Sequence, residues 1–339
     1  MSRPVVPSIL RPWRAVRGGG LLALGLVGLA LAGCGGTDRG TGVRVLVTDR
    51  FGEVQVLDRR DVAVQDGDRV LDVLRRATDA QADRTGDVVR IGDRAATGQR
   101  RWRFLINGVP AETGALDDAQ PTNEQRPTDR QTASEAPIHD GDTVWFDRAD
   151  LGDPRRPVAT PPRGGVGLFP EPFVHGFEGK RWPLRLECVD PRGDACRQVR
   201  DLIVRYGLPA SVAPLRSSYN PETARIAVGT WRDLRQDPAA GLLELGPRVS
   251  GVFLRPRADG RQVQLLAADG SVARTLGPGT GLVVASRYRD EPPSWIISGT
   301  DADGLARAIA AFDERTLRNR LAIAVSGGDV IALPVRAAK

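Results

Sequence analysis

The sequence contains few cysteines, histidines and aromatic residues. Its 339 residues include three cysteines and two histidines, and aromatic side chains make up 5%. A zinc module needs about four well-spaced cysteine or histidine ligands, and a disulfide-dense scaffold needs more than three cysteines. These counts exclude both classes, and we expect neither a metal nor a resident cofactor. The hydrophobic fraction of 41% is ample for packed cores, and the length corresponds to about two domains.

The sequence also lacks a stripe of positive charge. The formal net charge is +6, but residues 1–33 contribute four arginines and no acid, which leaves +2 for the rest of the chain. Downstream, arginines alternate with aspartates, as in Asp58-Arg59-Arg60-Asp61. A surface that follows a phosphate backbone needs basic residues clustered on one face. We therefore expect no binding to nucleic acid.

The N-terminal residues 1–33 have the pattern of an export signal. Four arginines precede an uncharged run, Leu21–Leu31, which is far shorter than the ~20 residues that span a bilayer. The run ends in Leu31-Ala32-Gly33-Cys34 and is followed by the polar residues 35–42. The tetrapeptide resembles the lipobox of bacterial lipoproteins. That resemblance implies cleavage before Cys34 and lipidation of its thiol, which would anchor the chain to the outer face of the cell membrane.

Two other interpretations fit this segment. The chain could be secreted with an incidental Cys34, or residues 1–33 could stay uncleaved as a single membrane anchor. We favour lipidation because the basic segment, the apolar run, the lipobox and the polar tether 34–42 occur together. The mature chain is then expected to be extracytoplasmic.

The two remaining cysteines are expected to form a local disulfide. Cys188 and Cys196 lie eight positions apart, and Asp190-Pro191-Arg192-Gly193 between them is typical of a turn. An extracytoplasmic location is oxidising, so the bond would persist. The alternative, a redox-active or metal-binding pair, would need closer spacing or further ligands.

Residues 43–148 change from strand to helix periodicity and back. Alternating segments at 43–48 and 51–57 predict a hairpin, and the apolar residues between Val70 and Ala77 predict a helix capped by Asp68. Further strands are expected at 102–106 and 143–146. This order predicts an α+β fold of the β-grasp type.

Several residues of this region carry a closer resemblance. Trp102, Asn107-Gly108, Gly114 and Gly141-Asp142-Thr143-Val144-Trp145 resemble the pattern of a bacterial β-grasp family that is similar to the C-terminal domain of transcobalamin and intrinsic factor. The wider group consists of soluble-ligand-binding domains. The resemblance implies a face for a small ligand, such as a corrinoid, with stacking on Trp102 and Trp145 and a hydrogen bond from Asn107. The alternative is that the tryptophans fill a core and Asn107-Gly108 makes a tight turn.

A proline-rich segment, 149–183, separates this domain from the rest and is expected to be a linker. Its three phenylalanines, Phe169, Phe173 and Phe177, suggest that part of it packs on a domain. His175 lies in it without an obvious catalytic partner. Because His139 and His175 are the only histidines, no catalytic triad is recognisable, and we expect no enzyme.

Residues 184–339 alternate between strand and helix patterns, which predicts an α/β domain with a mixed sheet. Expected pairs of strands include 249–254 with 263–266, and 320–325 with 330–333. Thr300 is expected to cap a helix over 304–312. The strand-to-helix junctions at 228–230 and 298–301 could present amides to an anion, although capping is the simpler role.

These observations predict a lipid-anchored protein of the bacterial cell envelope. Its function would be to bind a small ligand or to present it to a membrane transporter. The alternative is a structural protein whose two domains contact other envelope proteins or wall polymer.

Overall fold

The computed structural model describes residues 42–111, 131–153, 156–157, 164–217, 222–288 and 291–336. The predicted export signal, Cys34 and Gly114 lie outside these residues. Gly40–Lys339 forms a single compact unit, and all described elements belong to it. Within it we call residues 43–153 and 156–157 the first lobe, 164–183 the strap and 184–336 the second lobe.

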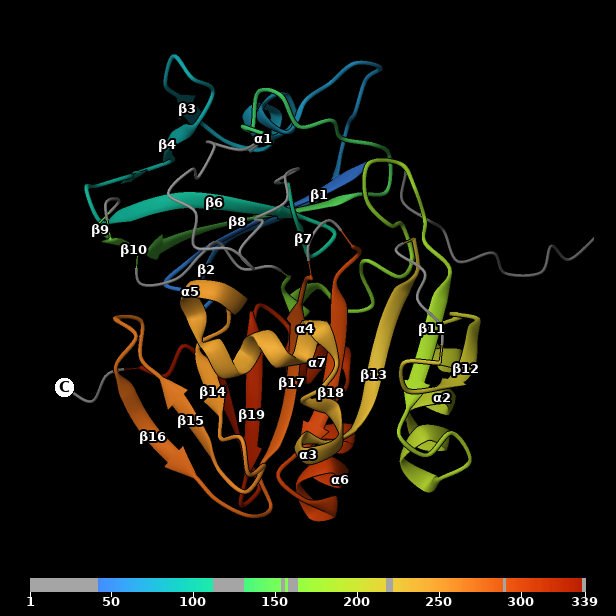
Figure 1. Cartoon of the computed structure of the whole chain (residues 1–339). Helices are drawn as coiled ribbons and strands as arrows, with labels where there is room; N and C mark the ends of the chain where they lie inside the picture. Colours follow the sequence, from blue (N-terminus) through green and yellow to red (C-terminus); the bar gives the residue numbers. More distant parts are fainter. Residues whose placement is uncertain are drawn as a thin grey trace, which may run out of the picture. The chain divides into compact units, whose positions relative to one another are not determined.

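The first lobe is built on a five-stranded sheet in the order β2-β1-β8-β6-β7 (Figure 1). The strands are β1 (Val43–Asp49), β2 (Val54–Val62), β6 (Arg100–Ile106), β7 (Val109–Pro110) and β8 (Thr143–Asp150). β1 and β8 are parallel neighbours, whereas β2, β6 and β7 run antiparallel to the strands beside them. The predicted hairpin of residues 43–57 is therefore present, with its second strand extended to Val62.

Helix α1 (Val70–Ala77) covers one face of this sheet (Figure 1). Its apolar stripe is buried against residues from β1, β6 and β8. The residue at the N-cap is Arg69, not the predicted Asp68. Asp68 instead accepts hydrogen bonds from Arg76 in the last turn of the helix. Two small sheets complete the lobe: β3 (Ala80–Ala82) with β4 (Val88–Ile91) and β5 (Arg94–Ala95), and β9 (Gly152–Asp153) with β10 (Arg156–Pro157).

The second lobe contains a seven-stranded mixed sheet in the order β12-β11-β13-β18-β17-β19-β20. The strands are β11 (Leu184–Cys188), β12 (Ala210–Pro214), β13 (Ala224–Thr230), β17 (Gly281–Ser286), β18 (Ser294–Gly299), β19 (Ala322–Ser326) and β20 (Asp329–Leu333). The first four in the sheet order are parallel, and the last three join by antiparallel pairing. The predicted mixed α/β architecture and the hairpin of β19 and β20 are confirmed.

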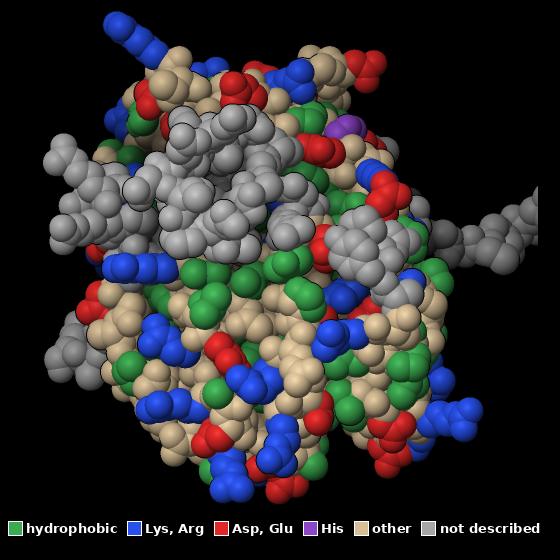
Figure 2. Space-filling view, viewed as in Figure 1, with side chains coloured by type: hydrophobic (Ala, Val, Ile, Leu, Met, Phe, Trp, Pro, Cys, Tyr) green, Lys and Arg blue, Asp and Glu red, His purple; other side chains and the backbone are tan. Residues whose placement is uncertain are grey.

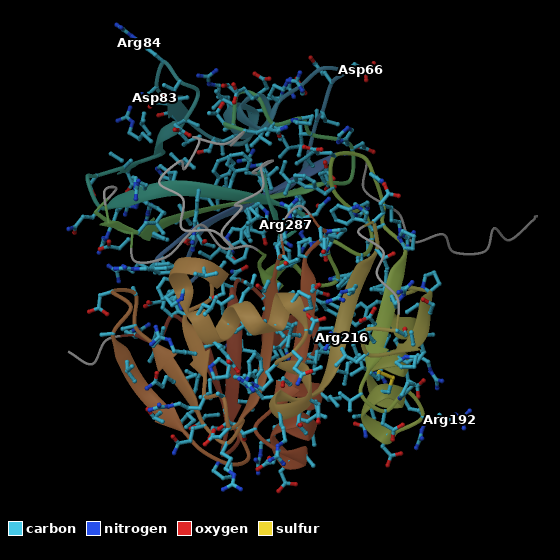
Figure 3. All side chains as sticks on the ribbon, in the orientation of Figure 1. Asp66, Asp83, Arg84, Arg192, Arg216 and Arg287 are labelled. Atoms are coloured by element: carbon cyan, nitrogen blue, oxygen red, sulfur yellow. A yellow bond between two sulfur atoms is a disulfide. The ribbon has the colours of Figure 1, made fainter. Side chains whose placement is uncertain are left out.

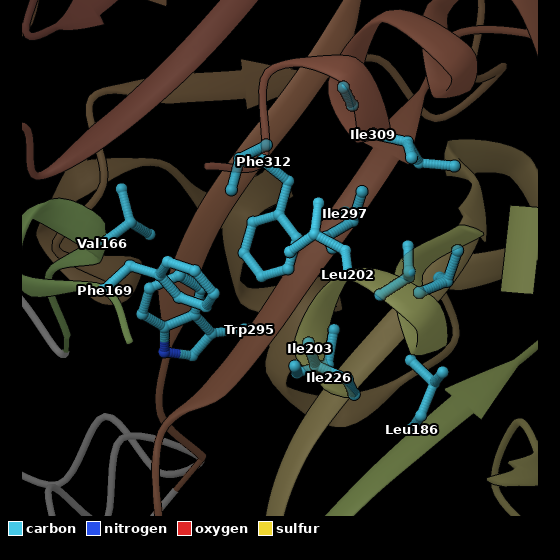
Figure 4. Packing of buried hydrophobic residues seen from close by; sticks show 14 of the residues in the cluster. Val166, Phe169, Leu186, Leu202, Ile203, Ile226, Trp295, Ile297, Ile309 and Phe312 are labelled. Atoms are coloured by element: carbon cyan, nitrogen blue, oxygen red, sulfur yellow. The ribbon is translucent and has the colours of Figure 1, made fainter. Parts of the chain in front are cut away.

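Alternate residues of this sheet enter two separate cores, as the period-two geometry of strands requires. On one face, α2 (Asp194–Arg205) and α6 (Ala302–Ala310) pack around Trp295 and Ile297 (Figure 4). α6 begins after Asp301, whose side chain accepts from the Gly304 amide, so the cap is one residue later than predicted. The short helix α7 (Glu314–Leu317) follows it.

The other face is covered by short elements and a three-stranded sheet. These are α3 (Trp231–Leu234), α4 (Pro238–Gly241), η2 (Leu242–Leu245), α5 (Pro247–Ser250), β14 (Leu254–Pro256), β15 (Val263–Leu266) and β16 (Val272–Leu276). The predicted strand over 249–254 is wrong in most of its length. Pro247 begins a helical turn that Gly251 ends in the left-handed conformation, and the strand starts only at Leu254.

The strap contributes large side chains to the cores. It contains η1 (Val166–Leu168). Phe169 and Phe173 pack against Trp295 in the second lobe, with ring centroids 5.7 and 5.2 Å away, and Phe177 joins the core of the first lobe. Leu168 packs with Trp145 of β8. This part of the proline-rich segment is therefore packed against both lobes.

The β1–β2 turn also connects the lobes. The ring of Phe51 lies 5.2 Å from that of Phe253, edge to face. Asn319 donates from Nδ2 to Gln55 Oε1 at 3.0 Å, and its backbone amide donates to the Gly167 carbonyl of the strap. These contacts give the two lobes and the strap a shared interior.

Candidate functional site

A recess of about 400 Å³ opens on the second lobe between α3 and the β14–β15 turn. It is lined by Arg232, Arg235, Gln236, Ala258, Asp259 and Arg261. Its volume lies toward the lower end of the range for small-molecule sites. The lining is polar and predominantly basic, so the recess suits a polar ligand.

Helix α3, on one side of the recess, is held in place by its buried side chains. Trp231 and Leu234 are buried in the core, which turns Arg232 and Arg235 outward. Arg235 donates two hydrogen bonds to the Glu244 carboxylate, at 2.8 and 2.9 Å, and the Trp231 indole N–H donates to the same group. The guanidinium of Arg235 lowers the pKa of Glu244. The carboxylate thus holds Arg235 in one position and offsets its charge.

The turn side packs directly on α3. Gly260 has a φ of +73°, and a Cβ atom there would lie 3.2 Å from the Arg232 backbone nitrogen. The amide of Arg261 donates to Asp259 Oδ1 at 3.0 Å, which closes the turn. A glycine is required at this position both for the backbone conformation and for the close approach.

A buried ionic network fixes the chain beyond Gln236. Arg225 of β13 donates to Asp237 Oδ2 at 2.7 Å and to Glu187 Oε2 at 3.4 Å. Asp237 also accepts from the amides of α4. Burial alone would lower the pKa of Arg225, but the carboxylates of Asp237 and Glu187 raise it. This network holds the segment after α3 against the sheet.

Another arginine approaches the recess from the sheet edge. Arg216, labelled in Figure 3, donates from Nη1 to Gln236 Oε1 at 3.4 Å. Over the face drawn in Figure 2, basic and acidic side chains are otherwise interspersed. Within the described part of the chain, Arg232 and Arg261 have no ion pair and no side-chain hydrogen bond.

The structure does not bring the two predicted ligand-stacking tryptophans together. Trp102 is 5% exposed and lies in the core beside α1, whereas Trp145 is 1% exposed and lies on the opposite face of the sheet with Leu168 and Leu321. The Trp145 indole N–H donates to Thr48 Oγ1 at 2.7 Å. In this arrangement both rings fill cores.

Asn107, the predicted hydrogen-bonding residue, is fully buried and already has partners. Its Nδ2 donates to Asp142 Oδ1 at 2.7 Å and to the Gly176 carbonyl, and its Oδ1 accepts from the Thr143 amide. With a φ of +51° it also makes the tight turn after β6. Asn107 thus joins the sheet to the strap.

The predicted disulfide between Cys188 and Cys196 is present, with Cα atoms 5.9 Å apart. It ties the end of β11 to the first turn of α2, and both cysteines are buried in the core. Its place in the core fits a structural bond.

Both histidines lie beside carboxylates, which the sequence analysis does not predict. His175 Nδ1 lies 2.5 Å from Glu171 Oε1, and His139 Nδ1 lies 3.5 Å from Asp142 Oδ2. Burial raises the pKa of Asp142 despite its hydrogen bonds from the His139 amide and Asn107. The sequence signal for these pairs is their spacing: Glu171 and His175 are four positions apart, and His139 and Asp142 are three positions apart.

Of the strand-to-helix junctions considered as anion sites, the one at 298–301 is capped by Asp301, which accepts from the Gly304 amide, whereas Thr230 makes no side-chain cap hydrogen bond to α3. Thr230 Oγ1 donates to Asp233 Oδ2 at 2.6 Å, and Thr300 Oγ1 donates to the Gly277 carbonyl. Across the described ranges, no three histidine, cysteine or acidic side chains are grouped so that they could hold a metal ion. None of the helices in those ranges has the length and apolar character needed to cross a membrane.

Comparisons with known proteins do not assign the chain to a family. No protein-family model matches it, and no curated protein does either.

Proposed function

We propose that this protein is a lipid-anchored, extracytoplasmic protein that binds a small polar ligand in the recess between α3 and the β14–β15 turn. The recess is the observation that carries the proposal, because it is a concave site of about 400 Å³ with several polar side chains converging on it. The ligand would then be available to a membrane transporter near the anchor. Cys34 would carry the lipid.

The order of elements in the first lobe supports a β-grasp fold as part of this proposal. A β1–β2 hairpin is followed by α1, and a late strand, β8, inserts parallel to β1 in the middle of the sheet. A corrinoid, the ligand class implied by the family resemblance, remains a probe to be tested. We place the ligand in the recess because Trp102 and Trp145 are buried on opposite faces.

A second candidate function is suggested by the edge of the second sheet. β12 pairs only with β11 among the described strands, and Val212 within it is 38% exposed. An exposed edge strand is a ready surface for another protein. An interaction protein of the envelope would use such an edge and would need no small ligand.

The anchor is tested by expressing the full-length chain in a bacterium and analysing it by mass spectrometry. We expect a mature product that begins at Cys34 and carries a diacylglyceryl group, and a Cys34→Ser variant without lipid. A folded product that keeps residues 1–33 would contradict the anchor.

Ligand binding is tested separately by thermal shift of the full-length chain in detergent. The panel contains cobalamin, haem, neutral sugars, amino acids and organic anions. Stabilisation by at least one small solute supports the receptor function. No stabilisation by any of them, together with abundant protein adducts after cross-linking in intact cells, would favour the interaction protein.

A further inference from the structure

The charges of the recess separate into paired and unpaired groups. Arg235 faces the Glu244 carboxylate through two hydrogen bonds, so its charge is locally offset. Arg232 and Arg261 have no acidic partner within the described residues. The acid in the lining, Asp259, accepts a hydrogen bond from the amide of Arg261.

The two unpaired guanidiniums come from two segments that are far apart in the sequence. Arg232 belongs to α3, which is anchored by Trp231, and Arg261 belongs to the β14–β15 turn. Gly260 approaches the Arg232 backbone closely, so the two segments lie side by side. A guanidinium offers a planar fork of donors that matches carboxylate and phosphate oxygens. Two such guanidiniums at one recess favour a ligand with two negative charges.

We propose that the recess binds a small dianion, either a dicarboxylate or a phosphate monoester, with Arg232 and Arg261 both donating to its charged oxygens. This inference rests on the proposed function and names its class of ligand. A cavity of about 400 Å³ limits the ligand to a small organic molecule. Gln236 also lines the recess, as a neutral donor and acceptor for the uncharged part of the ligand.

The test is calorimetric titration of the full-length chain in detergent at neutral pH and physiological salt. Succinate is the dicarboxylate probe and glycerol 3-phosphate is the phosphate probe, so the two arms distinguish the sources of charge. Acetate and glycerol are the matched probes with one charge and with none. We expect succinate or glycerol 3-phosphate to bind about tenfold or more tightly than either matched probe.

The variant Arg232→Gln/Arg261→Gln should weaken that binding by about tenfold or more. The control variant Arg59→Gln/Arg274→Gln removes the same charge from exposed strand positions on β2 and β16, and should change the affinity by less than about twofold. Equal losses in both variants would overturn the inference, because the effect would then be one of net charge. Binding of long-chain polyphosphate without binding of either dianion would also overturn it.

The result also separates this inference from the proposed function. A neutral solute that binds the wild-type chain, while neither dianion does, overturns the dianion and leaves a small-ligand receptor. If no probe binds, and the near-ultraviolet circular dichroism spectrum shows that the protein is folded, the dianion inference and the small-ligand receptor function are both overturned.

Discussion

Gly52 donates its backbone N–H to Asp147 Oδ1 over 2.9 Å. The same carboxylate accepts from the Phe51 amide and from Thr48 Oγ1. Asp147 therefore shapes the β1–β2 turn, in which Arg50, Phe51 and Gly52 all have positive φ. Because this turn carries Phe51 to Phe253, one buried carboxylate in the first lobe determines a contact with the second.

Replacing Gly52 should disrupt this contact. Gly52 and Gly67 both have a φ of +84°, but a Cβ atom at Gly52 would lie 1.7 Å from the Asn319 carbonyl oxygen, whereas nothing lies within 4 Å at Gly67. Left-handed strain costs each alanine variant about 1 kcal/mol, and the steric clash adds about 2 kcal/mol at Gly52. Urea denaturation of Gly52→Ala and Gly67→Ala checks this. Equal losses of stability in the two variants would show that the lobes do not meet at Gly52.

Removing the Asp147 carboxylate should leave a buried cation without a partner. Arg103 Nη2 lies 3.2 Å from Asp147 Oδ2, and its side chain is 9% exposed. Burial lowers the pKa of Arg103, since the charged form is poorly solvated there. We expect Asp147→Ala to reduce the free energy of unfolding by about 3 kcal/mol.

The double variant Asp147→Ala/Arg103→Leu provides the control for this effect. It should recover part of the loss, because no charge is then buried alone. A double variant that is less stable than Asp147→Ala would contradict this explanation.

The disulfide should stabilise the second lobe. Its cysteines are eight positions apart, and closure of a loop of this size contributes about 2.5 kcal/mol. Cys188→Ala/Cys196→Ala should lower the free energy of unfolding by that amount and shift the midpoint of denaturation down accordingly, and a reductant should then have no further effect. Cys34→Ser is the control and should behave like the wild type. An unchanged midpoint in the double alanine variant would contradict the prediction.

Stability should fall in acid partly through Asp49. Burial would raise the pKa of this carboxyl, but the hydrogen bonds and charge of Arg148, with the shorter bond at 2.7 Å, and the hydrogen bond from the Arg50 amide together outweigh burial and lower it. A pKa that is lower in the folded state stabilises the protein above the ordinary value of about 3.9, and this stabilisation is lost as the pH falls through the folded value. Asp49→Asn should therefore be less stable than wild type at neutral pH, and the difference should shrink in acid.

Denaturation in urea at about pH 7 and about pH 3 measures this difference. Asp329→Asn, at an exposed position on β20, is the matched control. Its difference from wild type should be small at both pH values. A difference for Asp49→Asn that stays constant with pH would exclude the ion pair as its cause.

The sequence predicts the regular elements of the fold better than their ends. Continuous apolar runs such as Gly281–Ser286 and Ala322–Ser326 are strands whose side chains enter a core on each face. Helix starts were misplaced by one residue at both Asp68 and Thr300. In each case an adjacent residue took the cap, and the predicted residue formed a different hydrogen bond.

The recess could not be predicted from the sequence. Its arginines lie on a four-residue helix, on the residue after it, and on a turn more than twenty positions later, and segments this short have no periodicity to detect. The family resemblance implies that Trp102 and Trp145 share one ligand face. The structure separates them because Trp145 is directly opposite Leu105, not Trp102, so the two rings project to different sides.

The position of Phe169 and Phe173 in the second core has a practical consequence. An expression fragment that begins at Leu184 would leave two ring-sized holes beside Trp295. A fragment that ends at residue 148 would lose Phe177 and the Gly176 carbonyl, which accepts a hydrogen bond from the Asn107 side chain. Dividing this polypeptide at its proline-rich stretch would thus give two incomplete pieces, and biophysical work should keep residues 164–183 joined to both neighbours.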